Sequence, residues 1–323
     1  MSNKNMTRIF TLNDIQQVIN PEEVIQVIEE GFALYAKGLV IVAPLASLEI
    51  EERGIAKIKY GYIKGQNIYV MKVGSFFPGN AKNNMPAINA SMQIYNQHTG
   101  EFEALLLDEA YLTNVRTAAA GAIVAKYFSP KEITKIGIIG TGVQAKFQLS
   151  YLQYITSCKK VVVWGRNIAA VEQFQLDMEK QGFIIEIAKG IADVTSQCNL
   201  IVTATSAVEP VISADQVQSG ALVISVGADT KNKCEIDDAL LKKADLIIAD
   251  SKIQCGELGN IAQALQSGAI TENFIVELGD AIIKNIKRKD EQQLIIANLT
   301  GVAVQDIQIA NLAYQALLKK GRN

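Results

Sequence analysis

Histidine is almost absent from this sequence of 323 residues. His98 is the one histidine, and turn-forming residues surround it in Asn96-Gln97-His98-Thr99-Gly100. The simplest interpretation is a solvated histidine at the tip of a hairpin, so a histidine-based triad or metal site is almost excluded. Any chemistry must therefore use carboxylates, lysines, arginines or a bound cofactor.

Cysteine is scarce as well, with four residues and no CxxC pair. This usage predicts reduced, mostly buried thiols rather than a disulfide framework or a zinc site. We therefore expect no metal ion. The four positions are Cys158, Cys198, Cys234 and Cys255.

The sequence also lacks long apolar runs and an excess of charge. No run approaches the roughly 20 residues that a membrane helix needs, and the polar start MSNKNMTRIFTLND has no apolar segment of the signal-peptide kind. The formal net charge of −2 gives no reason to expect nucleic acid or a membrane surface as a partner. We expect a cytoplasmic globular protein.

The first part of the chain contains a helix followed by β-like runs. Asn20-Pro21-Glu22-Glu23 has the pattern of a helix start, and apolar residues follow it at helical spacing as far as Tyr35. Between residues 45 and 108 lie four short runs typical of strands, AKIKYGYI, NIYVMKVGSF, INASMQIY and EFEALLL. This texture predicts an α+β unit with a mainly antiparallel sheet.

An alanine-rich helix over about 113–128 ends this part, and Ser129-Pro130 is the predicted domain boundary. Beyond it, apolar strands alternate with helices, which predicts a parallel sheet covered on both faces. A last amphipathic helix over 302–319 should pack back onto the first domain. The expected strands are 135–139, 161–164, 183–187, 200–204, 222–226 and 246–249.

The fold prediction is therefore an α/β protein with a Rossmann doubly wound parallel sheet and a second, α+β domain. Residues 129–301 should form the dinucleotide-binding domain. Residues 1–128 and 302–323 should together form the other one.

A glycine-rich turn is the sharpest local signal. Gly140-Thr141-Gly142-Val143-Gln144-Ala145 has the form GxGxxA, placed after a predicted strand and opening a predicted helix. Gly140 permits the tight turn, Gly142 lets the backbone approach a pyrophosphate, and Ala145 lets the helix lie close to the strand. Such turns also occur for purely structural reasons, but the completed strand–helix–strand context favours dinucleotide binding.

The end of the next strand bears on the choice of cofactor. It reads Val163-Trp164-Gly165-Arg166-Asn167, without the carboxylate that would hold a ribose diol. Arg166 could instead meet a 2′-phosphate, or it could be a solvated loop arginine. The pattern favours NADP(H) and leaves NAD(H) possible.

Several segments together resemble the ornithine cyclodeaminase/mu-crystallin family over about residues 8–320. They are MKV at 71–73, YLTNVRTAAA at 111–120, GTGVQA at 140–145 and SVGAD at 225–229. Members of this family transfer hydride between a nicotinamide and an amino or imino carbon next to a carboxylate. The resemblance implies a substrate-binding and dimerisation role for the non-Rossmann domain, and a homodimer.

The resemblance also implies three residues with chemical roles. Arg116 would grip the substrate carboxylate with its fork of donors, unless it is a helix arginine that only pairs with Asp108 or Glu109. Lys72 would lie beside the reacting carbon and also bind the carboxylate, although a lysine in an apolar run can instead snorkel. Asp229 would exchange a proton with the substrate nitrogen, with a helix-cap or turn aspartate as the alternative.

Supporting contacts follow from the same resemblance. Lys59 is a candidate for a further carboxylate ligand, with a solvated lysine as the alternative. The cofactor-binding candidates, besides Gly140, Thr141, Gly142, Val143, Gln144 and Arg166, are Thr203, Ala204, Thr205, Val226, Gly227, Thr300 and Gly301.

One departure from the family concerns the substrate pocket. Many members have an arginine shortly after a proline near position 45, whereas this chain reads Ala43-Pro44-Leu45-Ala46-Ser47. The predicted function is therefore reduction of a small imino acid, or oxidation of the matching amino acid, by an NAD(P)-dependent enzyme. The alternatives are an ornithine- or lysine-type cyclodeaminase that recycles its cofactor, and an NADPH-linked ligand-binding protein of the mu-crystallin type.

Overall fold

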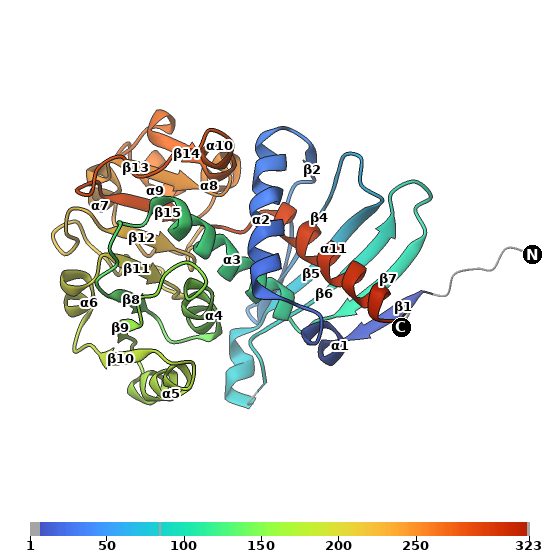
Figure 1. Cartoon of the computed structure of the whole chain (residues 1–323), viewed down its shortest axis with the longest axis horizontal. Helices are drawn as coiled ribbons and strands as arrows, with labels where there is room; N and C mark the ends of the chain where they lie inside the picture. The colour runs from blue at the N-terminus through green and yellow to red at the C-terminus, as the bar shows by residue number, and fades with distance from the viewer. Residues whose placement is uncertain (1–6, 84, 322–323) are drawn as a thin grey trace, which may run out of the picture. The chain divides into compact units, whose positions relative to one another are not determined.

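The structure is a computed structural model that describes residues 7–83 and 85–321, and it divides into two compact units (Figure 1). Unit 1 comprises Met1–Arg116 and Ala303–Asn323, and unit 2 comprises Thr117–Val302. The first boundary therefore falls inside helix α3 (Tyr111–Phe128), 12 residues before the predicted one. Pro130 marks where this helix ends, but packing decides the division, and the carbonyl of Thr117 already accepts a hydrogen bond from Gln148 of unit 2.

Unit 1 begins with strand β1 (Arg8–Thr11) and helices α1 (Leu12–Gln16) and α2 (Pro21–Ala36). The predicted start of α2 is confirmed, because the Asn20 side chain accepts hydrogen bonds from the amides of Glu22 and Glu23. These bonds satisfy amides that have no partner inside the helix.

The sheet of unit 1 is mainly antiparallel, as predicted. Its strands run in the order β1-β7-β6-β5-β4-β2, β3 pairs with β4, and the β1–β7 pair is parallel. The strands that follow β1 are β2 (Val40–Val42), β3 (Ala46–Ile50), β4 (Gly54–Ile63), β5 (Ile68–Phe76), β6 (Ile88–Asn96) and β7 (Phe102–Leu107), with a 3₁₀ helix η1 (Pro78–Asn83) between β5 and β6. His98 is exposed in the turn between β6 and β7, which confirms the hairpin tip.

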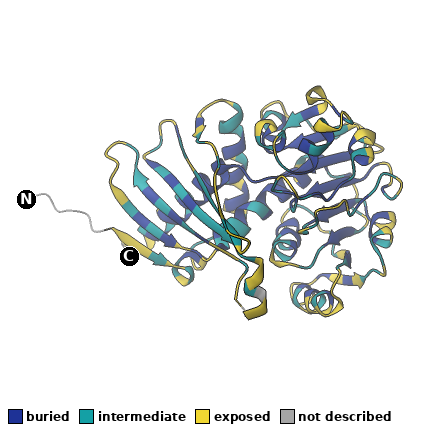
Figure 2. Ribbon diagram, turned by 180° about the vertical axis from the view of Figure 1, so that it is seen from behind, coloured by how far each residue is buried: buried dark blue, intermediate teal, exposed yellow. Residues whose placement is uncertain are grey.

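The two faces of this sheet differ in burial, and the alternation is visible along its strands (Figure 2). Val70, Met92 and Leu106 lie on the buried face and are at most 1% exposed. Helix α11 (Ala303–Lys320) packs against β4, β5 and α2, which confirms that the last helix returns to the first domain. Because successive side chains of a strand point to opposite faces, the other face carries the partly exposed residues.

Unit 2 contains the predicted parallel sheet. Its order is β10-β9-β8-β11-β12-β15-β13-β14, and every neighbouring pair is parallel. After β8 the chain adds β9 and β10 on one side, and it then returns to add β11 and β12 on the other side of β8. β8 and β11 therefore flank a topological switch point. The strands are β8 (Ile136–Ile139), β9 (Lys160–Trp164), β10 (Ile184–Ile187), β11 (Leu200–Thr203), β12 (Leu222–Ser225), β13 (Leu246–Ala249), β14 (Ile275–Glu277) and β15 (Ile295–Asn298).

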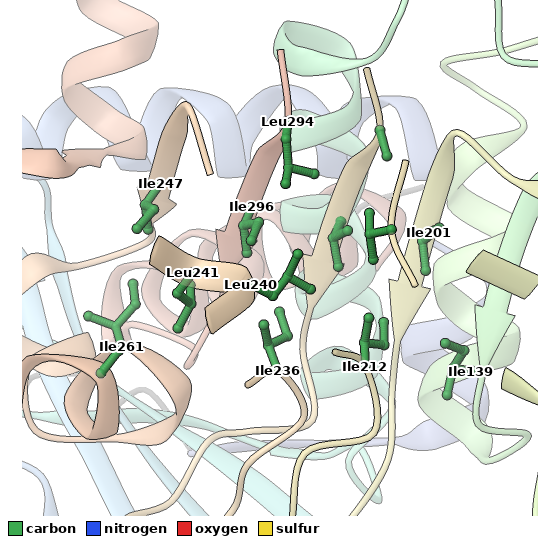
Figure 3. Close-up of a cluster of buried hydrophobic side chains, with 14 of the residues drawn as sticks. Ile139, Ile201, Ile212, Ile236, Leu240, Leu241, Ile247, Ile261, Leu294 and Ile296 are labelled. Atoms are coloured by element: carbon green, nitrogen blue, oxygen red, sulfur yellow. The ribbon is translucent and has the colours of Figure 1, made fainter. Parts of the chain in front are cut away.

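Helices cover this sheet, and the apolar side chains between the layers form the core of unit 2 (Figure 3). Ile201, Ile236 and Ile296 in this cluster are fully buried. The helices that follow α3 are α4 (Val143–Leu152), α5 (Ile168–Glu179), α6 (Ile191–Gln197), α7 (Asp238–Lys243), α8 (Lys252–Cys255), α9 (Gly259–Gln266) and α10 (Leu278–Ile283), with a 3₁₀ helix η2 (Glu272–Phe274). Within the described part of the chain, no helix is long and apolar enough to cross a membrane.

Candidate active site

A buried cluster of charges lies in unit 1, where three separate elements meet. Lys72 comes from β5, Arg116 from α3 and Asp306 from α11, and each residue is at most 5% exposed. Asp306 Oδ1 accepts a hydrogen bond from Lys72 Nζ at 2.9 Å and another from Arg116 Nε at 3.1 Å. The structure therefore brings together the two residues predicted to bind a carboxylate.

The guanidinium of Arg116 is held from two sides. Its Nη1 donates to Gln305 Oε1 at 2.7 Å, while its Nε donates to Asp306, so the fork has a fixed direction and Nη2 is the remaining donor nitrogen. The considered pairing with Asp108 or Glu109 is not what the structure shows, because the buried carboxylate at Arg116 belongs to Asp306.

Lys59 lies near this cluster. It stands directly opposite Lys72 in the antiparallel β4–β5 pair, and its side chain is partly exposed. Its charge also reaches the cluster, because Lys59 is one of the three cations that favour the charged form of Asp306. All three candidates for carboxylate binding therefore lie within one part of unit 1.

The charges of the cluster shift one another. Burial lowers the pKa of Lys72, and Asp306 opposes that shift. For Asp306, burial alone would raise the pKa, but Arg116, Lys72 and Lys59 outweigh it and hold the pKa below its usual range. Two cations, Lys72 and Arg116, thus contact the one carboxylate of Asp306, and this surplus of positive charge suits an anionic ligand.

A second carboxyl group, Asp108, lies at the edge of the cluster. It is completely buried, and its Oδ2 accepts a hydrogen bond from the amide of Leu112 at 2.9 Å in the first turn of α3. Burial raises the pKa of Asp108 to about 7, partly opposed by the Leu112 amide and Lys72. Near neutral pH it therefore compensates the cations only in part.

Asp306 is the main residue of this cluster that the sequence analysis missed. The segment Ala303-Val304-Gln305-Asp306-Ile307 reads as an amphipathic helix, in which a single acid is usually solvated. The neighbouring residues did indicate burial. Gln305 and Asp306 lie between Ala303-Val304 and Ile307-Gln308-Ile309, which is a largely apolar stretch. A buried carboxylate is often paired with a cation, and Lys72 and Arg116 were the candidates for this pairing.

The glycine turn of unit 2 has the geometry of an anion site. Gly140 has a φ of +109°, and a Cβ there would lie 2.4 Å from the carbonyl oxygen of Ala204, so only glycine fits. Gly142 begins α4 as its N-cap without a side-chain cap, and a Cβ there would meet no protein atom within 4 Å. Protein packing therefore explains Gly140, whereas Gly142 leaves space in front of the first amides of α4.

The other residues of the turn differ in exposure. Ala145 is fully buried, as the close approach of helix and strand requires, whereas Val143 is 59% exposed. The side chain of Thr141 lies beside Gly165, where an added Cβ would come within 2.9 Å of it. Gln144 also belongs to the first turn of α4, and its Oε1 accepts a hydrogen bond from Gln148.

Arg166 lies just beyond the end of β9. It is exposed, whereas the next residue, Asn167, caps α5 through the amide of Ala170 at 3.2 Å. Arg166 therefore follows β9, the strand that pairs with β8, and no carboxylate stands at this position.

The ends of β11 and β12 are tied together from inside. Thr203 is fully buried, and its hydroxyl donates to Glu235 Oε2 at 2.8 Å, so this side chain holds the segment in place. Ala204 and Thr205 are partly exposed. Val226 is buried, and a Cβ on Gly227 would lie 2.2 Å from the carbonyl oxygen of Thr205, which explains the glycine.

Thr300 and Gly301 are fixed by a buried aspartate after β13. Thr300 Oγ1 donates to Asp250 Oδ1 at 3.1 Å, and the amide of Gly301 donates to Asp250 Oδ2 at 2.6 Å. Gln254 adds hydrogen bonds to the Thr300 hydroxyl and the Gly301 carbonyl. The segment therefore has a defined conformation at the carboxyl end of β15.

Asp229 lies in the loop after β12, and its side chain is 41% exposed. Its Oδ1 accepts a hydrogen bond from Lys233 Nζ at 2.7 Å. It does not cap a helix, because the next helix, α7, begins at Asp238 and is capped by Asp237. Asp229 therefore occupies a loop at the carboxyl edge of the parallel sheet, where folds of this class place ligands.

The cysteines and acids give no sign of a metal site. Within residues 7–83 and 85–321, no group of three histidine, cysteine, aspartate or glutamate side chains could hold a metal ion. The four cysteines are free thiols, and Cys198, Cys234 and Cys255 are buried.

Known proteins resemble this chain over almost its whole length. An uncharacterized cyclodeaminase of Sinorhizobium fredii is 34% identical and covers 95% of both chains, and alanine dehydrogenase of Archaeoglobus fulgidus is 31% identical and covers 97% of this chain and 96% of its own. Thermococcus litoralis Δ1-pyrroline-2-carboxylate reductase, solved in complex with NADH and L-proline, has a TM-score of 0.93 at 27% identity and 98% coverage of both chains. The family model of the ornithine cyclodeaminase/mu-crystallin family matches residues 5–321, and the chain therefore belongs to this family.

Proposed function

We propose that this protein is an NAD(P)-dependent oxidoreductase that acts on a small imino or amino acid, at the carbon next to its carboxylate. The observation that carries the proposal is the buried cluster of Lys72, Arg116 and Asp306 with its surplus of positive charge. The relatives support it, since they include an alanine dehydrogenase and a Δ1-pyrroline-2-carboxylate reductase solved with NADH and L-proline.

In unit 1, Arg116 and Lys72 bind the substrate carboxylate. Asp306 and Gln305 fix the direction of the guanidinium, so its remaining nitrogen can meet a carboxylate oxygen without reorganisation. Lys72 contributes an ammonium from the neighbouring strand, and Lys59 adds positive charge at the partly exposed side. A neutral substrate would leave this surplus charge uncompensated, which is why the proposal specifies an acid.

In unit 2, the segment Gly140–Ala145 binds the cofactor pyrophosphate at the start of α4. Thr141, Val143 and Gln144 line this turn, and the space in front of Gly142 allows the phosphates to approach the backbone. The ends of β11, β12 and β15 hold the nicotinamide, through the segments 203–205, 226–227 and 300–301.

Arg166 favours NADP(H) over NAD(H). Its exposed guanidinium follows β9, at the position where Rossmann proteins recognise the adenosine ribose. The T. litoralis relative binds NADH, so a preference for NADP(H) would distinguish this chain from it.

Asp229 exchanges the proton. A bound nicotinamide supplies or accepts hydride at the substrate carbon. In the reductive direction the Asp229 carboxyl donates a proton to the imine nitrogen, and in the oxidative direction its carboxylate takes one from the amine. Lys233 donates a hydrogen bond to Asp229 Oδ1 at 2.7 Å and holds the carboxyl group in place.

The outward face of the unit 1 sheet supports a homodimer. Tyr69 and Tyr95 stack on this face with ring centroids 4.8 Å apart, and Phe102 follows at 5.0 Å from Tyr95. Met71 and Leu105 continue the apolar surface on either side of Gln93. A second copy of this face would cover it, and Met71→Lys should convert the dimer to a monomer in analytical ultracentrifugation.

A cyclodeaminase is the second candidate, because a relative with 34% identity has that name. The two activities are separable, since a cyclodeaminase releases ammonia without a net change in nicotinamide absorbance. The missing arginine near Pro44 argues for the reductase or dehydrogenase.

The test is a screen of purified protein with both reduced cofactors and a set of cyclic and acyclic imino acids, alongside ornithine, lysine and alanine with the oxidised cofactors. We expect a change in nicotinamide absorbance with an imino acid, and a higher KM in Arg116→Lys, which keeps the charge but loses the fork. Cofactor binding without turnover of any of these compounds would instead favour the ligand-binding alternative.

A further inference from the structure

A buried glutamate, Glu235, lies beneath the carboxyl ends of β11 and β12 in unit 2. It is 0% exposed, and its two oxygens accept five hydrogen bonds. Oε1 accepts from the amide and the hydroxyl of Thr205, and Oε2 accepts from the Thr203 hydroxyl, the Ser225 hydroxyl and the Gly227 amide, all at 2.7–2.8 Å.

All five donors are neutral. In the part of the chain that the structure describes, no lysine or arginine forms an ion pair with Glu235. A buried carboxylate without a cation needs every available donor to replace its lost hydration. The donors come from two strand ends, so Glu235 fixes the two segments relative to each other.

Glu235 is itself held in place. Its amide donates to Asn260 Oδ1 at 2.7 Å, and Asn260 Nδ2 donates to Ser225 Oγ at 2.8 Å. Its carbonyl accepts a hydrogen bond from the amide of Val211 at 2.9 Å. The loop between Gly227 and Glu235, which carries Asp229, is therefore closed at its base.

We propose that Glu235 is the positioning residue of the nicotinamide site, and that it sets both the cofactor-binding segments and the base of the Asp229 loop. This inference rests on the proposed function, which assigns 203–205 and 226–227 to the cofactor and Asp229 to proton exchange. Glu235 touches neither ligand in this assignment and acts through the backbone of Thr205 and Gly227.

The hydrogen-bond pattern explains why the residue is glutamate. Each of its oxygens accepts from one backbone amide, Thr205 N on Oε1 and Gly227 N on Oε2. A hydroxyl can rotate to become an acceptor, but a backbone amide cannot. In Glu235→Gln the side-chain amide would therefore face a backbone donor on whichever side it lies, and one strand end would have to move.

The experiment compares Glu235→Gln with Glu172→Gln, an exposed glutamate on α5 that loses the same charge. NADH and NADPH are titrated by fluorescence with each protein, and kcat and KM are measured with the best imino acid. We expect Glu235→Gln to weaken cofactor binding by about tenfold or more and to lower kcat at saturating cofactor. The KM for the imino acid should stay within about threefold, because unit 1 is unchanged, and Glu172→Gln should match the parent.

Two smaller variants keep the test decisive if Glu235→Gln does not fold. Ser225→Ala and Thr203→Val each remove one hydroxyl donor and leave the carboxylate in place, so each should weaken cofactor binding by about two- to fivefold. Cofactor affinity and kcat equal to the parent in all folded variants would overturn the role of Glu235. A parent that binds neither NADH nor NADPH would instead overturn the proposed function.

Discussion

The two units bury charge in opposite ways. In unit 1, Lys72 and Arg116 share one oxygen of Asp306, and the elements that carry them are far apart in the sequence. In unit 2, the carboxylate of Glu235 has five neutral donors, two of them on the adjacent strands β11 and β12 and three of them two residues beyond the ends of these strands. The carboxylate of unit 1 is paired with cations, whereas the carboxylate of unit 2 is stabilised by neutral hydrogen-bond donors.

The difference supports the proposal that the cluster of unit 1, and not Glu235, meets a ligand. The charges of unit 1 do not cancel, because Lys72 and Arg116 share the single carboxylate of Asp306. Such a cluster gains free energy from an added anion. In unit 2 both oxygens of Glu235 are saturated, so this group stabilises a conformation and leaves no capacity for binding.

Asp306→Asn should break the first cluster. Two buried cations would lose their carboxylate, and removing one partner of a buried ion pair costs about 3–5 kcal/mol. We expect the free energy of unfolding, measured in urea, to fall by that amount. Glu51→Gln breaks the exposed pair with Arg53 and is the control, which should match the parent. A loss in Asp306→Asn as small as in the control would mean that the cations are solvated.

Asp229→Asn should lower the rate of the reaction without changing how unit 2 binds the cofactor. The change is nearly isosteric and removes proton exchange, so kcat should fall by at least about 100-fold, as expected for a general acid or base. Cofactor affinity should stay within a few-fold, since the contacts of Glu235 are unaffected. Steady-state kinetics and a fluorescence titration measure the two quantities. Turnover equal to the parent would make Asp229 a turn residue only.

The sequence predicted most elements of both units because their signals are local. Asn20-Pro21 marks the start of α2, and the apolar run before Gly140 marks β8. Strand β15, which lies between β12 and β13, was missed, although its run 294–297 has the same sequence, LIIA, as the predicted strand 246–249. The local signal was therefore present, and the parallel pairing with β12 and β13 establishes the strand.

The two buried acids, Asp306 and Glu235, were missed because most of their partners are distant in the sequence. A single Asp306 in an amphipathic helix and Glu235 in a polar loop both look solvated, and their partners lie 30 or more residues away for most of their hydrogen bonds. Lys72, Arg116 and Asp229 were found only through the resemblance to a family. The sequence thus identified the residues proposed to meet ligands, whereas the residues that hold them needed the structure.

Arg166→Ala tests the role of an exposed charge of unit 2, whereas Asp306→Asn tests the buried charges of unit 1. One charge-assisted contact to a 2′-phosphate contributes about 1.5–3 kcal/mol, or roughly tenfold to a hundredfold in affinity. We expect the parent to bind NADPH more tightly than NADH, and Arg166→Ala to narrow that difference by weakening NADPH alone. Dissociation constants of the two cofactors that are equal in the parent would contradict the preference.

The titration of Asp108 gives the smallest expected effect. It tests how much of the positive charge of Lys72 and Arg116 is compensated by carboxylates. Its pKa is raised to about 7 by burial, so the folded protein holds a proton at pH values where the unfolded chain, with a pKa near the usual 3.8, does not. Stability therefore falls as pH rises through this interval and becomes constant above the folded pKa. Asp108→Asn keeps an oxygen for the Leu112 amide and removes the titration.

The free energy of unfolding of the parent, measured relative to Asp108→Asn in urea, should therefore decrease by about 1 kcal/mol between pH 6 and pH 8. Most of this decrease should occur below pH 7.5, where the folded carboxyl group still binds a proton. A difference that is independent of pH would show that Asp108 is already charged at pH 6. The cations of Lys72 and Arg116 would then be compensated by two carboxylates, and the surplus positive charge of unit 1 would be smaller than proposed.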